Sequence, residues 1–252
     1  MFIKSILIFI FFYFLSIKKI DHTYFHLGEN YCLINIIKKN NKSNFPLIAL
    51  HEDENTCISS FQSLPNSSQF YLIQLKQKGK RLLEFKKNKI TYIFDPNRIF
   101  TKPGIKNTLS LYNKSYSAEI FNKIHLFADS ILRVILPQNK SDHIIAIHNN
   151  TDNKYSILSY QESTNTKQLY INPKKDSDDF FLVTERNDFD FFKQNNYNVI
   201  LQSKEAIDDG SLSVYCQNKN IPYINIEAQI GHQEEQIKML KLCEELLNIR
   251  NN

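Results

Sequence analysis

The chain has 252 residues, of which 42% are hydrophobic and 13% are aromatic. This length and composition exclude a disordered chain and favour one domain with a sizeable core. The formal net charge is +5, and the lysines are scattered without interleaved aromatic residues, so no nucleic acid partner is expected.

The N-terminal segment is apolar between basic residues. Lys4 precedes an apolar run over residues 5–17, and Lys18 and Lys19 follow it. This pattern is typical of a secretory signal or a short anchor, and the run falls below the roughly 18 apolar residues of a spanning helix. A cleaved signal, an uncleaved anchor and a buried helix remain open for residues 1–20. The protein is therefore expected to be exported, as a periplasmic or secreted protein, touching a membrane only through an uncleaved anchor.

The first half of the folded part alternates strands and helices. Hydrophobic patterning predicts strands at 31–37, 45–50 and 70–75, a helix at 56–64, and a hairpin of strands 81–85 and 90–94. Over residues 117–136 apolar side chains recur at three- and four-residue steps. This spacing predicts a long helix with one buried face.

The second half continues the alternation. Strands are predicted at 144–147, 180–184, 197–202, 212–217 and 223–228, and an amphipathic helix at 234–249. Alternating elements indicate an α/β fold. We expect a single domain over residues 28–250, with a mixed, mostly parallel central sheet flanked by helices.

The cysteines and the paired acids are predicted to have structural roles. The four cysteines form no C-x-x-C pair, which excludes a zinc ribbon; they are Cys32, Cys57, Cys216 and Cys243. A disulfide is possible in an exported protein, but their apolar surroundings favour small buried thiols. The acids Asp178-Asp179 and Asp208-Asp209 lie in loop-like sequence and are predicted to be turn residues.

Two predicted strands end in histidine. The run "LIAL" leads into His51 and three acids, and the run "IIAI" leads into His148. In open α/β sheets, ligands bind beyond the carboxyl ends of the strands. His51 and Glu54 can reach one ion from a tight turn, and His148 completes the two-His-one-Glu set of catalytic zinc sites. We therefore predict one Zn²⁺ per chain.

The order of short motifs resembles that of the zinc carboxypeptidase superfamily. The order is His51-Glu54, Asn97-Arg98, His148 and Glu227, within residues 47–232. The segment "FDPNRIFT" is similar to the D-x-N-R-x-F motif of the aspartoacylase and succinylglutamate desuccinylase branch, and "IHNNT" to its third-ligand segment. The resemblance implies a zinc carboxypeptidase-like fold.

The resemblance also implies substrate contacts. Arg98, assisted by Asn97, would bind a substrate carboxylate, because a guanidinium pairs with carboxylates through two parallel hydrogen bonds. The alternative is a structural pair between Arg98 and Asp95. Arg81 would take the place of the oxyanion-stabilising arginine of the family, unless it belongs to a solvated hairpin.

Glu227 would be the general base that takes a proton from the attacking water. A structural ion pair is its alternative role. Asn149 is expected to contact substrate, and His232 to orient substrate or Glu227, or else to cap the last helix. The sequence leaves open which tyrosine assists; the candidates are Tyr197, Tyr215 and Tyr223.

These features predict an exported, zinc-dependent hydrolase of amide bonds. The favoured activity is a carboxypeptidase that acts on small peptides of the cell-wall type, or on acyl-amino acids, with a free carboxylate. The enzymatic alternatives are an N-acyl-amino-acid deacylase and an N-acetylmuramoyl-L-alanine amidase. A ligand-binding domain that retains the fold without catalysis is the alternative outside the enzymes.

Overall fold

The computed structural model describes residues 20–136, 142–152 and 154–251. The segment predicted to be a signal or anchor lies, up to residue 19, outside the described residues. Among the helices that are described, none combines the length and the apolar character needed to cross a membrane.

The described chain folds around one mixed sheet of nine strands in the order β1-β2-β4-β3-β7-β11-β9-β10-β8. The strands are β1 (Ile20–Leu27), β2 (Asn30–Lys38), β3 (Phe45–Ala49), β4 (Phe70–Lys76), β7 (Ile144–Asn150), β8 (Thr166–Tyr170), β9 (Phe180–Val183), β10 (Val199–Gln202) and β11 (Tyr223–Gln229). The central strands β4, β3, β7 and β11 are mutually parallel. Their carboxyl ends therefore open on the same edge of the sheet.

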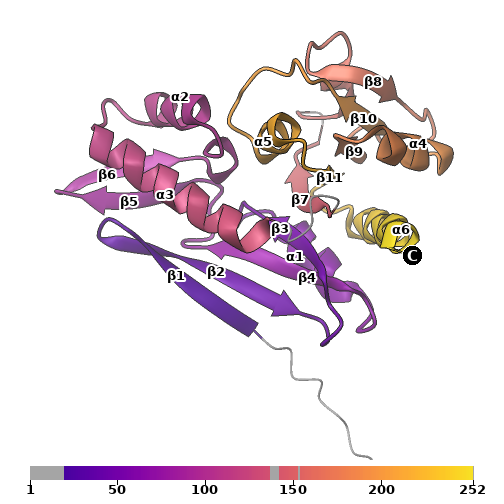
Figure 1. Ribbon diagram of the computed structural model, residues 1–252, viewed down its shortest axis with the longest axis horizontal. Coiled ribbons are helices and arrows are strands. Elements are labelled where there is room, and N and C mark those ends of the chain that lie inside the picture. Colours follow the sequence, from indigo (N-terminus) through magenta and orange to yellow (C-terminus); the bar gives the residue numbers. More distant parts are fainter. Residues whose placement is uncertain (1–19, 137–141, 153, 252) are drawn as a thin grey trace, which may run out of the picture.

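Helices cover both faces of this sheet (Figure 1). One face packs against α2 (Lys102–Tyr112), α3 (Ala118–Ile135) and α5 (Leu212–Lys219), and the other against α1 (Asn55–Ser63), α4 (Arg186–Gln194) and α6 (Gln233–Asn251). Each face has its own apolar core. Phe127 of α3 belongs to the first core, and Phe61 of α1 and Met239 of α6 belong to the second. The predicted α/β domain with helices on both faces is thus confirmed.

Side-chain alternation decides which face each strand residue occupies. In β7, Ile145 and Ile147 belong to the core under α1 and α6, while Ile144 and Ala146 belong to the core under α3. Because successive side chains point to opposite faces, His148 falls on the α3 side of the sheet. The same alternation of side chains decides which residues of β11, the strand beside β7, share this face of the sheet with His148.

The hairpin β5 (Leu83–Lys87) and β6 (Ile90–Phe94) forms a separate two-stranded sheet, as predicted. Its turn residues Asn88 and Lys89 both have positive φ, which is the backbone of a type I′ turn.

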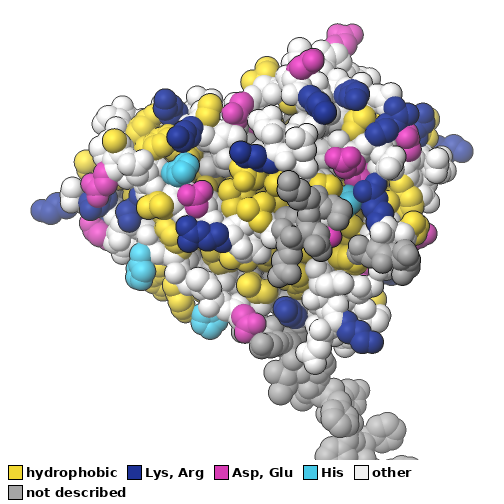
Figure 2. All heavy atoms as spheres, viewed as in Figure 1, with side chains coloured by type: hydrophobic (Ala, Val, Ile, Leu, Met, Phe, Trp, Pro, Cys, Tyr) yellow, Lys and Arg dark blue, Asp and Glu magenta, His cyan; other side chains and the backbone are white. Residues whose placement is uncertain are grey.

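All four cysteines are buried and free, as the apolar surroundings predicted. On the face shown in Figure 2, basic and acidic side chains are interspersed.

The prediction of a strand at 212–217 is wrong, because this segment is the helix α5. Ser211 caps it, since its side chain accepts a hydrogen bond from the Val214 amide. Leu212 and Cys216, one helical turn apart, are both buried on the sheet. Four elements were not anticipated from the sequence; they are β1, α2, β8 and α4.

Candidate metal centre

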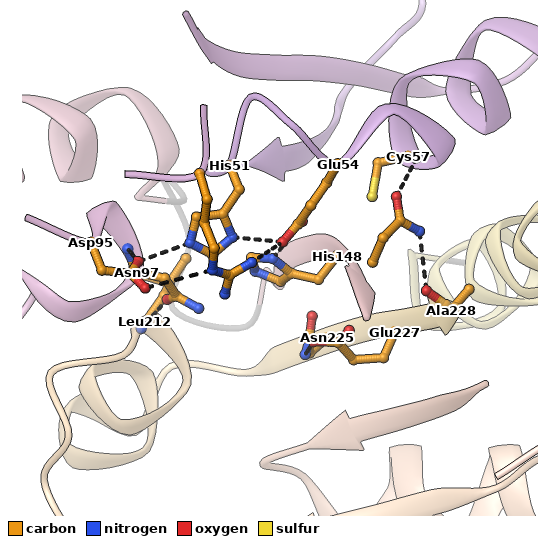
Figure 3. A network of polar contacts seen from close by, with 12 residues as sticks. His51, Glu54, Cys57, Asp95, Asn97, His148, Leu212, Asn225, Glu227 and Ala228 are labelled. Atoms are coloured by element: carbon orange, nitrogen blue, oxygen red, sulfur yellow. Dashed lines mark hydrogen bonds and ion pairs between the residues drawn. The ribbon is translucent and has the colours of Figure 1, made fainter. Parts of the chain in front are cut away.

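Three neighbouring strands deliver the polar cluster to one edge of the sheet. His51 follows the end of β3, and His148 lies near the end of β7. Glu227 lies on β11 directly opposite His148 in the strand register. Figure 3 shows His51, Glu54 and His148 converging, with Glu227 beside them. Side chains separated by more than a hundred residues of sequence thus share one site.

His51, Glu54 and His148 form the cluster that the sequence predicted as metal ligands. Their donor atoms lie within 4.8 Å of one another. Glu54 links the two histidines: its Oε1 is 2.7 Å from His51 Nδ1 and its Oε2 is 3.0 Å from His148 Nδ1. All three side chains are almost completely buried. Such a buried set of nitrogen and oxygen donors is suited to a divalent metal ion.

Asp95 contacts the other side of the His51 ring. His51 Nε2 lies 2.8 Å from Asp95 Oδ1, and Nδ1 is the ring nitrogen that faces Glu54. Asp95 is itself held, because its Oδ1 accepts from the Asn97 amide and its own amide donates to Thr108 Oγ1. A carboxylate behind a histidine ligand is the usual support of a metal site. From the sequence, Asp95 is expected only as a partner of Arg98; its position just before Asn97-Arg98 is the signal that it belongs to the site.

The ionised carboxylates of the cluster favour the binding of a cation. Burial lowers the pKa of His51, but the Glu54 and Asp95 carboxylates outweigh it and raise the pKa to about 9. Burial also raises the pKa of Glu54, but both histidines outweigh it and hold the pKa well below its usual range. The pKa of Asp95 falls to about 2, because its contacts with His51 outweigh burial. Two carboxylates therefore stay ionised beside two imidazoles, and this set of residues fits a cation.

One ring nitrogen also lacks a partner. His148 Nε2 is buried and makes no hydrogen bond within the described chain. Buried polar atoms are rarely left unpaired. Within the described chain the His148 imidazole is therefore hydrogen bonded through Nδ1 alone, to Glu54.

Glu227 is a buried carboxylate with little polar support. Within the described chain, its Oε1 accepts one hydrogen bond, from Asn225 Nδ2 at 3.2 Å, and it forms no ion pair. Burial raises the pKa of Glu227 to about 7, with Glu54 adding to the effect and His148 opposing it. A carboxyl group with such a pKa can both accept and release a proton near neutral pH.

Arg81 and Arg98 lie at the rim of the site. Arg81 Nη1 is 2.8 Å from Glu54 Oε1, and about half of the Arg81 side chain is exposed. Arg98, in a short 3₁₀ turn over residues 96–98, donates to the Asn97 carbonyl, and its Nη2 is 3.6 Å from Asp209 Oδ2. The alternative role of Arg98 is seen in the backbone alone: its amide donates to the Asp95 carbonyl at 3.0 Å, whereas the guanidinium that lies nearest to the Asp95 carboxylate is that of Arg81, with Nε 4.0 Å from Oδ2. Asn97 uses its side-chain oxygen to accept from the Leu212 amide.

A cavity of about 380 Å³ connects these residues. Besides the cluster, Glu227 and both arginines, it is lined by Tyr155 and Tyr160, whose hydroxyl groups are hydrogen bonded to each other. Neither tyrosine was singled out from the sequence, because no motif surrounds them. Tyr223 is buried in the cavity wall, whereas Tyr197 packs on Phe181 away from it.

Two predicted substrate contacts have other partners. Asn149 accepts from the Cys57 amide of α1 and donates to the Ala228 carbonyl, so its side chain ties α1 to the sheet. His232 Nδ1 is 2.9 Å from Asp179 Oδ2, and His232 does not line the cavity. Asn149 nevertheless lines the cavity, so its predicted contact with substrate stays a prediction, and so does the predicted role of His232.

A larger cavity, of about 860 Å³, lies near the amino ends of β3 and β7. Its polar residues His143 and Arg250 both contact the buried Asp188 carboxylate, at 2.9 and 2.7 Å. Asp188 is thus paired with Arg250 and hydrogen bonded to His143, and among the described residues the only candidate metal cluster belongs to the smaller cavity. The candidate active site is therefore the smaller of the two cavities.

No protein-family model matches the chain, and no curated protein matches it. Two solved structures, each of a "putative metallopeptidase", are similar to it. The protein from Shewanella amazonensis SB2B has 14% identity and a TM-score of 0.36, and that from Shewanella baltica OS155 has 11% identity and a TM-score of 0.41. Each comparison covers 90% of this chain and 85% of the other. The resemblance to zinc carboxypeptidases stays a prediction.

Proposed function

We propose that the chain is a zinc-dependent hydrolase of amide bonds, acting as a carboxypeptidase on small peptides or acyl-amino acids with a free carboxylate. The observation that carries the proposal is the buried cluster of His51, Glu54 and His148 with Glu227 opposite His148 on the next strand. Export belongs to the same proposal and rests on the sequence pattern of residues 1–20.

The cluster supplies suitable zinc ligands. His51, Glu54 and His148 would hold the ion through imidazole nitrogens and a carboxylate oxygen, which is the two-His-one-Glu set of zinc peptidases. Zinc in such a set polarises a carbonyl and activates a water molecule as a nucleophile. Asp95 fixes the tautomer of His51 by accepting the proton of Nε2.

Glu227 is placed to move the proton. Its carboxylate would accept a proton from the attacking water and then give it to the leaving amine. The single hydrogen bond from Asn225 keeps the Glu227 side chain oriented without neutralising it. Because burial raises its pKa to about 7, both protonation states are accessible during one turnover.

The two arginines would handle the negative charges of the reaction. Arg98 lies at the cavity wall with an exposed guanidinium edge and would bind the substrate carboxylate. Arg81 lies against the metal-binding Glu54 and would stabilise charge that develops on the carbonyl oxygen. A carboxylate anchor supports the carboxypeptidase over an amidase, which has no need of one.

Metal content and substrate choice test the proposal. The purified wild-type protein is expected to contain one zinc ion per chain, and His51→Ala to contain none. Arg98→Ala is then expected to lose activity selectively on peptides with a free carboxylate, compared with the same peptides amidated at that end. A wild-type protein that binds no zinc under any condition would instead favour the ligand-binding domain. Equal losses on both substrates would count against the carboxylate anchor.

A further inference from the structure

The carboxylate of Asp209 lies beside Arg98 in the wall of the site cavity. Asp209 Oδ2 is 3.6 Å from Arg98 Nη2, and 46% of the Asp209 side chain and 38% of the Arg98 side chain are exposed. Both residues line the cavity that contains Glu227. Two opposite charges are therefore presented to whatever binds there.

This distance leaves both charges available to a ligand. A charge-assisted hydrogen bond between a guanidinium and a carboxylate is about 2.7–2.9 Å long, so the pair at 3.6 Å is in electrostatic contact without sharing a hydrogen bond. The other carboxylate oxygen, Asp209 Oδ1, accepts from the Ser211 amide at 2.9 Å. That contact fixes the direction of the side chain while Oδ2 keeps its hydrogen-bonding capacity.

The loop that carries Asp209 is fastened to the segment that carries Arg98. The Phe100 amide donates to the Gly210 carbonyl at 3.0 Å, and Thr101 Oγ1 donates to Asp208 Oδ1 at 2.7 Å. Asp208 Oδ1 also accepts from the Gly210 amide. Asp208 and Asp209 each accept from the amide two residues further on, as turn residues do, and Asp209 is in addition directed at Arg98.

A contact between two glycines makes this close approach possible. A Cβ atom added to Gly210 would lie 2.5 Å from the Gly104 Cα and 2.6 Å from the Arg98 carbonyl oxygen, and one added to Gly104 would lie 2.2 Å from the Gly210 Cα. The φ of Gly210 is +80°, a conformation that L side chains rarely adopt. The position of Asp209 next to Arg98 is therefore built into the backbone.

We infer that Arg98 and Asp209 together bind the head group of a substrate that carries an ammonium and a carboxylate on the same carbon atom. The inference rests on the proposed function, because it assigns the substrate carboxylate to Arg98. The ammonium group would donate to Asp209 Oδ2, and the carboxylate would accept from the Arg98 guanidinium. A 3.6 Å separation of the two protein charges suits two ligand charges that are equally close together. The scissile amide would then be formed by the side chain of that amino acid and not by its α-amino group, so within the proposed function this substrate class takes the place of substrates whose α-amino group is acylated.

Binding of two small probes tests the inference without any turnover. Norleucine, as each enantiomer, and hexanoate share a carboxylate and an apolar tail, and differ in the α-ammonium group. Dissociation constants are measured by calorimetry on the wild-type protein and on Asp209→Asn. The asparagine retains an oxygen to accept from the Ser211 amide, so the loop keeps its shape while the charge is lost. The wild-type comparison itself needs no variant.

We expect one enantiomer of norleucine to bind the wild-type protein at least about tenfold more tightly than hexanoate. In Asp209→Asn the two dissociation constants should come within about twofold of each other, mainly because norleucine binds more weakly. Equal binding of both probes to the wild-type protein would overturn the inference, as would a lack of norleucine binding. One further outcome would overturn the inference. If Asp209 only competes with ligands for Arg98, Asp209→Asn will bind both probes more tightly, and the ratio of the two dissociation constants will stay unchanged.

A second variant separates this inference from the proposed function. Arg98→Gln should weaken norleucine and hexanoate alike, because both depend on the carboxylate anchor. Hexanoate binding that survives Arg98→Gln would contradict the anchor and with it both proposals. Equal binding of norleucine and hexanoate to the wild-type protein, with zinc binding and carboxylate-dependent activity intact, would overturn the inference and leave the proposed function standing.

Discussion

Glu227 and His148 occupy opposite positions in the register of the parallel strands β11 and β7. Both side chains point to the face of the sheet that α3 covers, and both are more than nine-tenths buried. The strand pairing therefore brings the Glu227 carboxylate next to an imidazole of the candidate metal cluster. Because this relationship depends on backbone hydrogen bonds rather than on a flexible loop, the site is rigid where the proposed chemistry occurs.

Glu227→Gln should abolish turnover without loss of metal. The glutamine has the same shape but cannot accept and release a proton, so activity should fall by roughly 10²–10⁴-fold. Initial rates on a peptide substrate and zinc content by elemental analysis measure the two effects. The matched control is Glu234→Gln, an exposed glutamate at the start of α6, which should change neither. A Glu227→Gln variant of normal rate would remove Glu227 from the reaction.

Asp95→Asn should weaken metal binding. The asparagine can still accept from His51 Nε2 but lacks the charge that makes the imidazole a stronger ligand, so affinity should fall roughly 10–100-fold. Competition with a chromophoric chelator gives the zinc dissociation constant. His51→Ala, which removes a proposed metal ligand, shows how far the zinc affinity falls when a ligand is missing. Unchanged affinity in Asp95→Asn would show that the contact at 2.8 Å is structural.

His232→Ala should lower stability in acid more than in alkali. Burial lowers the pKa of His232, but its hydrogen bond and charge contact with Asp179 outweigh this and leave the pKa above its usual value. A raised pKa in the folded state means that the protonated pair stabilises the fold below the unfolded-state value of roughly 6.5. This contribution disappears as pH rises through the folded-state value. Urea unfolding at pH 5.5 and pH 9 should show a larger effect of the substitution at the lower pH.

Because one third of the His232 side chain is exposed, the difference should be small and should shrink in high salt. Asp179→Asn provides the reciprocal control, since it removes the same charge pair. An effect of His232→Ala that is equal at both pH values would mean that the ring acts through packing alone.

Gly210→Ala should destabilise the protein more than Gly79→Ala. Both glycines have a positive φ, but a Cβ on Gly79 meets nothing within 4 Å, whereas one on Gly210 meets the Gly104 and Arg98 backbone. The backbone conformation alone costs about 1–3 kcal/mol in either variant. Thermal and urea unfolding should show an additional loss for Gly210→Ala. Equal losses would mean that the loop of Asp209 can move away from Arg98 at little cost.

Much of the fold follows from local patterning. The steps of three and four residues over 117–136 predicted α3, and the run "IIAI" predicted β7 with His148 near its end. A buried strand followed by a histidine is a local feature, so His51 and His148 could be found without the structure. The helix α5 could not be recognised in this way, because "LSVYCQ" fits either period and its cap and its burial on the sheet decide between them.

The sequence by itself therefore determined the class of fold and the residue types of the metal cluster, since helix and strand periods are properties of the local backbone. Only the tertiary structure decided the partners of these residues. Asp95 behind His51, Asp209 beside Arg98, and Asn149 turned toward α1 all depend on which segments pack together. The order of strands and the docking of loops bring together residues far apart in the chain, and hydrophobic periodicity carries no information about those distances.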